Sequence, residues 1–302
     1  MLFRDPALEQ EKRSACSEMM NGFTLHKFDA GGNPTVLVDN VSGGIHGGNY
    51  PEVARNILNN KGLGGVDQVG FIEKPQREGP DGRMVMMGGE LCINALRCYG
   101  GFLASQRQLT AGNFSIETSG VDTPILVTVR SEEGITISKV QLDCVPVVSI
   151  ADDVYTVDLP GIRHHIVFTP KPLSKVELRR RLANMACHHH LEFEAIGMIA
   201  ISPFNGSFLI SPLVHVLATR TSIMETSCGS GSLAAYLVLA NSVGITQTKL
   251  WQPSGECLEV EEVGRHTYSV EGSVFPIFTG SFLFEGSTGY SGLVIDGSAK
   301  FV

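Results

Sequence analysis

The chain has 302 residues, of which 43% are hydrophobic and 18% are charged, and its formal net charge is −8. This length allows two domains, or one large domain with a substantial core. An acidic chain without a run of lysine and arginine lacks the basic face that nucleic acids require. It has no stretch of about 20 apolar residues, and its mixed-charge first 20 residues lack the apolar core of a signal peptide. We therefore expect a cytoplasmic protein that binds neither nucleic acid nor a membrane.

The first half of the chain predicts short strands and two helices. Its apolar segments are β-branched or alternate with polar residues, and Gly, Asn, Asp or Pro bound them. Strands are expected over residues 24–28, 35–38, 68–73, 84–87, 114–118, 125–130 and 135–142. A helix over 51–59 has a proline in its first turn, and a second helix runs from 92 to about 105.

The second half predicts the same kinds of element. An amphipathic helix is expected over 174–186, and an apolar helix from about 231 to 242. Strands are expected over residues 155–159, 165–168, 197–201, 207–210, 249–252, 258–263, 268–270 and 277–284. Each half thus holds several strands, one amphipathic helix and one apolar helix that follows a cysteine.

This correspondence predicts an α+β protein of two similar lobes, in which the two cysteine-led helix ends meet at a cleft. We assign residues 1–20 to an extension that could be disordered, 21–148 to an N-terminal lobe and 149–285 to a C-terminal lobe. The tail, 286–302, could pack back on the N-terminal lobe. The alternative is a superficial likeness, because most α+β proteins can be divided into halves that look alike.

Two of the seven cysteines, Cys92 and Cys228, lie between small or polar residues and the start of an apolar run. A thiol at a helix N-terminus is near unpaired N–H groups and the positive end of the dipole, which favour the thiolate. The chain has no Cys-x-x-Cys pair, which argues against a zinc or thioredoxin-type site. The pattern indicates a paired acid and base, although each cysteine alone would more simply be a buried apolar residue.

Two facing thiols suit the inversion of an amino acid at its α-carbon. A weakly acidic proton must leave one face, and another proton must arrive at the opposite face. A thiolate and a thiol would exchange these tasks according to the configuration of the substrate. The N–H groups at the helix ends could also bind the substrate carboxylate and stabilise charge that spreads into it. Asn94 and the segment Gly229, Ser230 and Gly231 are placed to supply these donors.

The two cysteine segments resemble motifs of the diaminopimelate epimerase-like family of cofactor-independent amino-acid racemases. Residues 92–98 keep both cysteines, the Asn and the Arg of the motif Cys-Gly-Asn-Gly-x-Arg-Cys and lack its glycines, whereas Cys-Gly-Ser-Gly at 228–231 is intact. Gly32-Asn33 before a strand resembles a third motif, and the resemblance spans roughly residues 22 to 286. It implies lobes that each curl a strand-rich layer around a central helix, catalysis by Cys92 and Cys228, and no pyridoxal phosphate or other cofactor.

Departures from the family pattern bear on the substrate. The stretch 218–225 replaces a Glu-Arg-Gly segment whose Arg helps bind a substrate carboxylate, and Gly161-Ile162-Arg163-His164 replaces Gly-Asn-Pro-His. Both changes disfavour diaminopimelate, because an unpaired buried charge is costly. Residues 68–73, 212–214 and 225–231 resemble the histidine racemase branch more closely. That branch makes D-histidine, in some bacteria for a nicotianamine-like metallophore.

The resemblance to this branch also points to the substrate-binding residues. Asn33, Gln68 (or its neighbour Asp67) and Glu225 are the first places to seek contacts with the imidazole or the ammonium of the substrate. For Glu225 the simpler alternative is a residue that caps a turn.

Other interpretations of the same residues stay open. The chain could be a diaminopimelate epimerase or a racemase of another amino acid, or an isomerase of the same fold that shifts a double bond. It could also be a redox-sensing protein without enzymatic activity, in which Cys92 and Cys228 form a reversible disulfide. A homodimer is compatible with each of these.

A histidine-rich segment invites a metal-binding hypothesis. Residues 187–194 read Cys-His-His-His-Leu-Glu-Phe-Glu, and these side chains bind metals. Adjacent side chains on a helix point in different directions, so three consecutive histidines seldom share one ion. We interpret the segment as a solvated helix end and predict no metal site.

Overall fold

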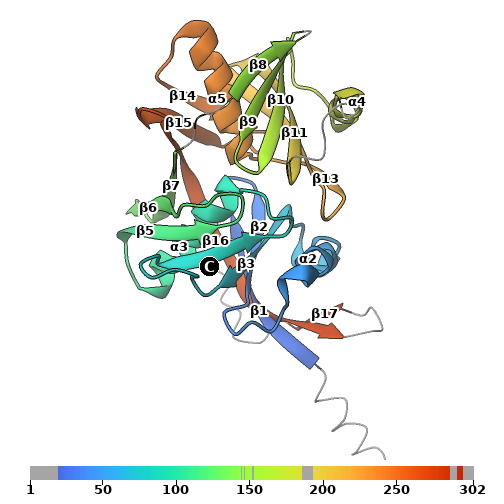
Figure 1. The fold of residues 1–302 in the computed structure, drawn as a ribbon, viewed down its shortest axis with the longest axis vertical. Coiled ribbons are helices and arrows are strands. Elements are labelled where there is room, and N and C mark those ends of the chain that lie inside the picture. Colours follow the sequence, from blue (N-terminus) through green and yellow to red (C-terminus); the bar gives the residue numbers. More distant parts are fainter. Residues whose placement is uncertain are drawn as a thin grey trace, which may run out of the picture.

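The structure is a computed structural model, and it describes residues 20–143, 145, 147–151, 153–185, 193–285 and 291–294. The fold is α+β and consists mostly of strands in a mixed sheet. Four α-helices lie in the described ranges: α2 (Tyr50–Leu58), α3 (Ile93–Gln106), α4 (Lys175–Met185) and α5 (Gly229–Val243). Figure 1 shows the elements gathered into two bodies, which we call the first and the second lobe. None of the helices described is both long and apolar enough to cross a membrane.

The first lobe closes a ring of strands around α3. Its strands are β1 (Met20–Asp29), β2 (Pro34–Asp39), β3 (Gln68–Glu73), β4 (Gly82–Met86), β5 (Ala111–Thr118), β6 (Ile125–Glu132) and β7 (Ile135–Asp143). Each pairs with the next, with β2–β3 and β4–β5 parallel, and β16 joins β7 back to β1. Because α3 contacts six of these strands, almost all of its side chains are buried.

The second lobe repeats this order of pairing around α5. Its strands are β8 (Val147–Ala151), β9 (Val154–Leu159), β10 (Ile162–Phe168), β11 (Ala195–Phe204), β12 (Ser207–Val216), β13 (Thr221–Met224), β14 (Gln247–Trp251), β15 (Cys257–Gly264) and β16 (Thr267–Glu285). The run β9–β10–β11–β12–β14–β15–β16 has parallel pairs at β10–β11 and β12–β14, in the same places as the first lobe. Strands β8 and β13 add to β9 and β12.

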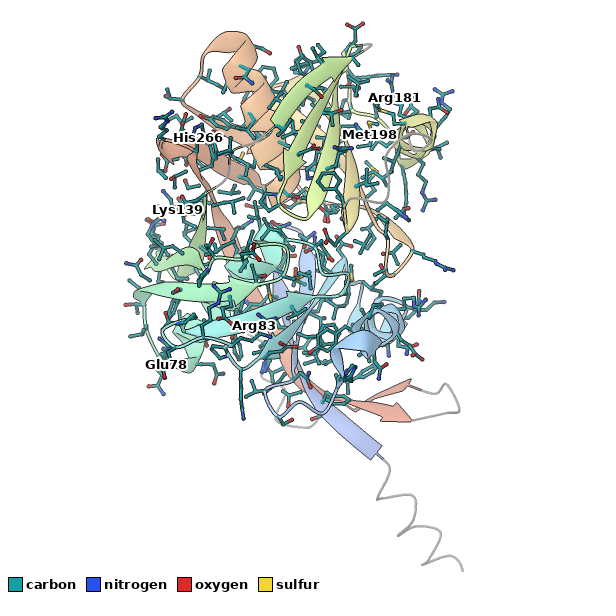
Figure 2. The ribbon with its side chains drawn as sticks, viewed as in Figure 1. Glu78, Arg83, Lys139, Arg181, Met198 and His266 are labelled. Carbon is teal, nitrogen blue, oxygen red and sulfur yellow. The ribbon has the colours of Figure 1, made fainter. Side chains whose placement is uncertain are left out.

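Strand β16 belongs to both lobes. Over residues 267–271 it lies between β7 and β15, and over 275–285 it pairs with β1. The short strand β17 (Ser291–Val294) pairs with its far end. Figure 2 marks Lys139 on β7, at the level where the two lobes meet.

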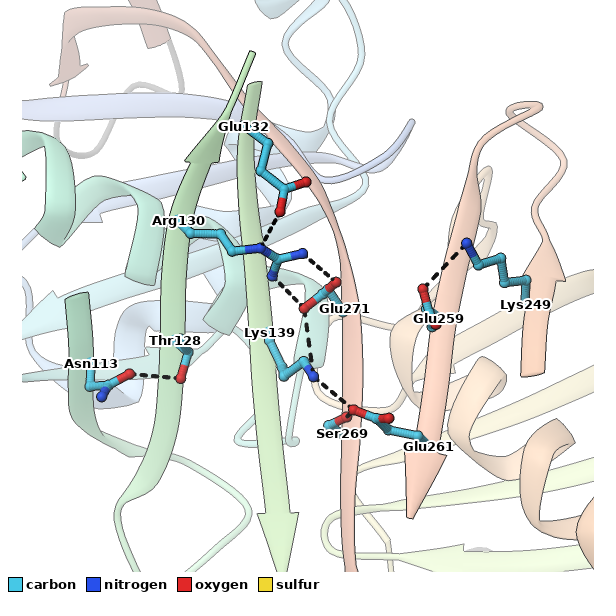
Figure 3. A network of polar contacts seen from close by, with 10 residues as sticks. All are labelled: Asn113, Thr128, Arg130, Glu132, Lys139, Lys249, Glu259, Glu261, Ser269 and Glu271. Carbon is cyan, nitrogen blue, oxygen red and sulfur yellow. Dashed lines mark hydrogen bonds and ion pairs between the residues drawn. The ribbon is translucent and has the colours of Figure 1, made fainter. Parts of the chain in front are cut away.

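Ion pairs link four strands at the junction of the two lobes. Glu271 on β16 binds Arg130 on β6 through two contacts of 2.6 and 2.8 Å, and Lys139 lies 3.7 Å from the same carboxylate and 2.7 Å from Glu261 on β15 (Figure 3). These side chains are partly exposed, so each pair adds only about 1 kcal/mol or less to stability. The network therefore serves to set the register of four strands more than to stabilise them.

Most predicted elements are present, and two differences have physical causes. Residues 147–151, which span the predicted boundary between the lobes and were not predicted as a strand, form β8, because Val147, Val148 and Ile150 suit an added edge strand. Strand β16 is continuous and includes Pro276, whereas the sequence predicted two separate strands over 268–270 and 277–284. The register with β1 shifts between Lys27 and Phe28, opposite this proline, and such an irregularity accommodates a residue without an N–H. Residues 1–19 and most of the tail lie outside the described ranges.

Candidate active site

Helices α3 and α5 begin in the same way, each with a cysteine at its N-cap. The backbone of Cys92 has φ −127° and ψ 107°, and that of Cys228 has φ −137° and ψ 107°. Each sulfur accepts a hydrogen bond of 3.3 Å from the backbone N–H three residues later, that of Ala95 or Gly231. The other N–H groups of a first turn have no partner within the helix.

The two helix ends meet, and glycine permits it. A Cβ atom on Gly229 would lie 2.7 Å from Cγ2 of Ile93 and 3.0 Å from Oδ1 of Asn94. A Cβ atom on Gly231 would lie 2.9 Å from the sulfur of Cys228. The Cys-Gly-Ser-Gly sequence thus lets a helix of the second lobe abut a helix of the first.

A small cavity of about 30 Å³ lies beside these helix ends. By the usual criterion it has room for only one or two water molecules. Its apolar lining comes from both lobes and includes Ile162, Val214 and Leu91. Its polar lining residues are Asp67, Gln68, Glu90, Cys92, Asn94, Thr221, Glu225 and Ser230. Cys228 is not among the lining residues, and its sulfur lies 3.8 Å from Oγ of Ser230, which is one of them.

Gln68 and Glu225 connect the two thiols. The thiol of Cys92 donates to Oε1 of Gln68, and Nε2 of Gln68 donates to Oε1 of Glu225 at 2.6 Å. The carboxyl group of Glu225 in turn lies beside Cys228, where it adds to the effect of burial in raising the pKa of that thiol. Two residues proposed from the sequence as substrate contacts therefore also join one catalytic candidate to the other.

Burial dominates the titration of the site. It raises the pKa of Cys92 and of Cys228 well above the ordinary thiol value, and the backbone N–H groups of Ala95 and Gly231 offset this only in part. The helix ends therefore favour the thiolates as expected, but burial outweighs them in this closed arrangement. Burial also raises the pKa of Glu225 to about 7, so that a carboxyl group beside Cys228 can gain or lose a proton near neutral pH.

Two further carboxyl groups of the cavity are perturbed in the same direction. Burial raises the pKa of Glu90 to about 7 and that of Asp67 to about 6. The carboxylate of Glu90 accepts a hydrogen bond of 2.9 Å from the backbone of Gly88. When these carboxyl groups are ionised, the cavity carries a strong negative charge.

The two asparagines have partners in the protein. Asn94 lines the cavity, and its Nδ2 donates to the carbonyl of Ser227 at 2.9 Å. Nδ2 of Asn33 donates to the same carbonyl at 3.1 Å, and Asn33 does not line the cavity. In this arrangement both side chains contact the residue before Cys228, whereas the sequence suggested that they contact the substrate.

Several site residues did not follow from sequence reasoning. Gln252 accepts a hydrogen bond of 3.0 Å from the backbone N–H of Cys228, and His164 shares one of 3.0 Å with Ser230. Burial lowers the pKa of His164 to about 3, so it is neutral. Two of these residues left a signal: Glu90 precedes Cys92 by two residues, much as Glu225 precedes Cys228 by three, and His164 keeps the His of the Gly-Asn-Pro-His pattern.

The metal-binding hypothesis finds no candidate in the described ranges, where no group of three or more His, Cys, Asp or Glu side chains could hold an ion. Residues 186–192, which contain the three histidines, lie outside those ranges.

Comparisons with known families and with known proteins agree on one family. The family model described as the histidine racemase CntK N-terminal domain matches residues 23–275. The chain is 27% identical over 238 residues to a histidine racemase of Fusobacterium nucleatum (strain ATCC 25586), covering 76% of this chain and 85% of that protein. It is 23% identical over 272 residues to a histidine racemase of Staphylococcus aureus (strain Mu50), covering 86% and 97%.

The fold has solved counterparts. A hydroxyproline epimerase from Agrobacterium vitis superposes with a TM-score of 0.62 over 89% of this chain and 94% of that one, at 11% identity. At such low identity the likeness shows the fold alone. The family match covers most of the chain, and it shows that this protein belongs to the histidine racemase family, within the racemases and epimerases.

Proposed function

We propose that this protein interconverts L- and D-histidine by a two-thiol mechanism in which Cys92 and Cys228 act alternately as base and acid on the α-carbon. The observation that carries the proposal is that both cysteines cap helices whose N-termini meet beside one cavity. Groups at two helix ends from opposite lobes can address opposite faces of one carbon atom. The two lobes, each with strands around a central helix, would then form the walls of a cleft.

The helix ends also supply a site for the substrate carboxylate. The sulfurs accept hydrogen bonds from the N–H groups of Ala95 and Gly231. The other first-turn N–H groups can then bind an anion, and they belong to Ile93, Asn94, Gly229 and Ser230. A carboxylate held between them would be stabilised further as charge spreads into it from the departing α-proton. This is the role predicted for Asn94, Gly229 and Ser230, through their backbone.

Glu225 can generate the thiolate that the buried site otherwise disfavours. In the resting state both thiols carry their protons, because burial raises the pKa of each. Transfer of the proton of Cys228 to the ionised Glu225 gives a thiolate and a neutral carboxylic acid, so that the buried negative charge only moves. Gln68 holds Glu225 through its Nε2 while its Oε1 accepts from Cys92, which keeps Cys92 as the thiol during that step.

The charges of the cavity suit histidine. Among the described residues that line it, Asp67, Glu90 and Glu225 are the charged ones, and all are acidic. An α-ammonium and an imidazolium are the complementary groups, and binding them would favour ionisation of these carboxyl groups. A second carboxylate, as in diaminopimelate, would meet three acidic groups and no lysine or arginine of this lining. D-histidine for a nicotianamine-like metallophore would be the corresponding product.

The cavity also indicates how the substrate enters. A space of about 30 Å³ cannot admit histidine, so the lobes must separate for binding and close again for reaction. Closure excludes water from the thiolate and strengthens the contacts to the carboxylate.

The test is proton exchange with inversion. The reduced protein is incubated in deuterium oxide with L-histidine, L-diaminopimelate or other single L-amino acids, and loss of the α-proton is followed by NMR while chiral chromatography detects the D-product. Exchange with D-product from histidine alone is the expected result. Turnover of another amino acid in place of histidine would refute the substrate, and no exchange over a broad panel would refute the racemase.

A further inference from the structure

The backbone carbonyl of Ser227, next to Cys228, accepts hydrogen bonds from two amide side chains of the other lobe. Nδ2 of Asn94 lies 2.9 Å from it and Nδ2 of Asn33 lies 3.1 Å from it. Asn33, Asn94 and Ser227 are each at most 1% exposed. These two uncharged amide groups donate to one buried carbonyl, and together they hold the start of α5 against the first lobe.

The amides are themselves fixed. Oδ1 of Asn33 accepts from Oγ1 of Thr35 at 3.1 Å, and Oδ1 of Asn94 accepts from Arg97 at 3.1 Å. The guanidinium of Arg97 also donates to the carbonyl of Ser273 in β16, at 2.7 Å, where the strand passes between the lobes. Each amide therefore has one orientation, with its nitrogen toward Ser227.

The turn that carries Asn33 is pressed against the second lobe. The hydroxyl of Ser254 donates to the carbonyl of Gly31 at 2.8 Å, and that of Thr226 donates to the carbonyl of Gly32. Gly32 has φ +95°, and a Cβ atom on it would lie 2.2 Å from Cβ of Ser254. Only glycine allows this approach, so the turn, Asn33 and the chain before Cys228 form one contact between the lobes.

The corresponding contact at Cys92 has a different chemistry. There the turn between β9 and β10 packs on the chain before Cys92, and a Cβ atom on Gly161 would lie 2.9 Å from the backbone nitrogen of Leu91. The residue that follows Gly161 is Ile162, in the place that Asn33 has after Gly32. An apolar side chain cannot bind a carbonyl, so the two cysteines are held across the lobes by unlike means.

We infer from this asymmetry that Asn33 and Asn94 are positioning residues, which set the sulfur of Cys228 relative to the α-carbon that Cys92 addresses. The inference rests on the proposed two-thiol function. Without the amide of Asn33, the carbonyl of Ser227 loses one of its two hydrogen bonds to the first lobe, and Cys228 moves out of line. The step at Cys92 is left intact.

This separation has a measurable signature. In the direction of reaction in which Cys92 is the thiolate, it removes the α-proton of one enantiomer. The lost contact between the lobes lets deuterium oxide reach the new S–H group, which exchanges its proton and returns a deuteron to the same face. The C–H bond breaks, an S–H bond forms and the exchange reverses both, so that no other reactant is needed. Inversion requires a correctly placed Cys228 thiol, so it is lost when the amide of Asn33 is absent. An error of about 1 Å can cost a reacting group on the order of 100-fold in rate.

The experiment compares Asn33→Ala with the intact protein and with Asn40→Ala, using L- and D-histidine separately in deuterium oxide. Asn40 is a matched control, since it is 4% exposed, lies in the same lobe and donates to the carbonyl of Ile45 at 2.9 Å, outside the cavity. The quantity measured is the deuterium in the remaining substrate divided by the inverted product. We expect it to rise at least 10-fold in Asn33→Ala for one enantiomer only, and to stay unchanged in Asn40→Ala.

An equal loss of exchange and inversion for both enantiomers would overturn the positioning role. A raised KM with an unchanged ratio would do so too, because it would make Asn33 a substrate contact. If Asn33→Ala does not fold, Asn33→Ser replaces it, and failure of both to fold would assign the amide to stability instead. If the intact protein neither exchanges nor inverts histidine, the proposed function fails, whereas an active intact protein with an unchanged ratio in the variants refutes only the positioning role.

Discussion

Nε2 of Gln68 donates a hydrogen bond of 2.6 Å to Oε1 of Glu225, a residue 157 positions away and in the other lobe. Because the two residues belong to different lobes, separation of the lobes would break this contact. It joins the thiol of Cys92, which donates to Gln68, to the carboxyl group beside Cys228. The protonation of one half of the site therefore depends on the position of the other half.

Removal of either sulfur should abolish most of the activity. We expect Cys92→Ala and Cys228→Ala each to lower the rate of histidine racemisation on the order of 100-fold or more, because each removes one of the two groups that exchange protons with the α-carbon. Chiral chromatography of the product measures the rate. Cys257→Ala is the control, since Cys257 lies at the start of β15 and is not part of the cavity lining. Near-normal turnover in either variant would contradict the mechanism.

Disruption of the contact between Gln68 and Glu225 should lower kcat more than it raises KM. In Gln68→Leu the thiol of Cys92 loses its acceptor and Glu225 loses a donor, so that the proton arrangement needed for reaction becomes less populated. A decrease of about 10-fold in kcat corresponds to about 1.4 kcal/mol, near the lower end of the range for a hydrogen bond to a charged group. Steady-state kinetics measures it. A variant that changes KM alone would show that Gln68 only binds substrate.

Glu225 should make stability depend on pH. Its pKa in the folded protein is raised to about 7 from 4.5, so between these values the folded state binds a proton that the unfolded state has released. The free energy of unfolding therefore falls as pH rises through this window, by at most about 1.4 kcal/mol per pH unit. His164, whose pKa is lowered to about 3, acts in the opposite direction below pH 6.5.

The comparison of Glu225→Gln with the intact protein isolates this effect, because His164 is common to both. Urea unfolding at pH 5, 6 and 7 should show the intact protein losing stability relative to the variant as pH rises. Parallel pH profiles would mean that Glu225 is ionised throughout the range.

Separation of the two helix ends should reduce activity and stability together. In Gly229→Ala the new methyl group would meet Ile93 at 2.7 Å, and both atoms belong to buried helices that cannot move freely. Overpacking of this kind costs about 1–3 kcal/mol. Gly264→Ala is a suitable control, because there the nearest atom lies 3.5 Å away and φ is unexceptional. Thermal unfolding and racemisation assays check both effects, and normal values for Gly229→Ala would show that the helix ends are free to separate.

Most helices and strands, and the N-cap positions of both cysteines, could be predicted from the sequence, because they depend on local patterns. Apolar alternation identified most strands but not β8, β13 or β17, and the change from polar residues to an apolar run located the caps at Cys92 and Cys228. The pairing partners could not be predicted in this way. The hydrogen bond from Asn33 to Ser227 spans 194 positions, and no local pattern indicates which carbonyl a buried amide will find.

The pKa values of the buried site residues were the other property that the sequence could not predict. A helix N-terminus lowers the pKa of a thiol, but complete burial raises it, and the sequence shows only the first effect. Glu90 illustrates the same limit, since its importance depends on its being enclosed with Glu225 and Asp67 by residues of both lobes.

The sharing of β16 has a consequence for how the polypeptide is made. The ring around α3 closes only when residues 275–285 pair with β1, near the opposite end of the chain. While the ribosome is still synthesising the second lobe, the first therefore has an open seam between β1 and β7, with unpaired backbone groups along both edges. The nascent first lobe cannot reach its final state alone, so the two lobes are expected to mature together, late in synthesis, in one cooperative transition.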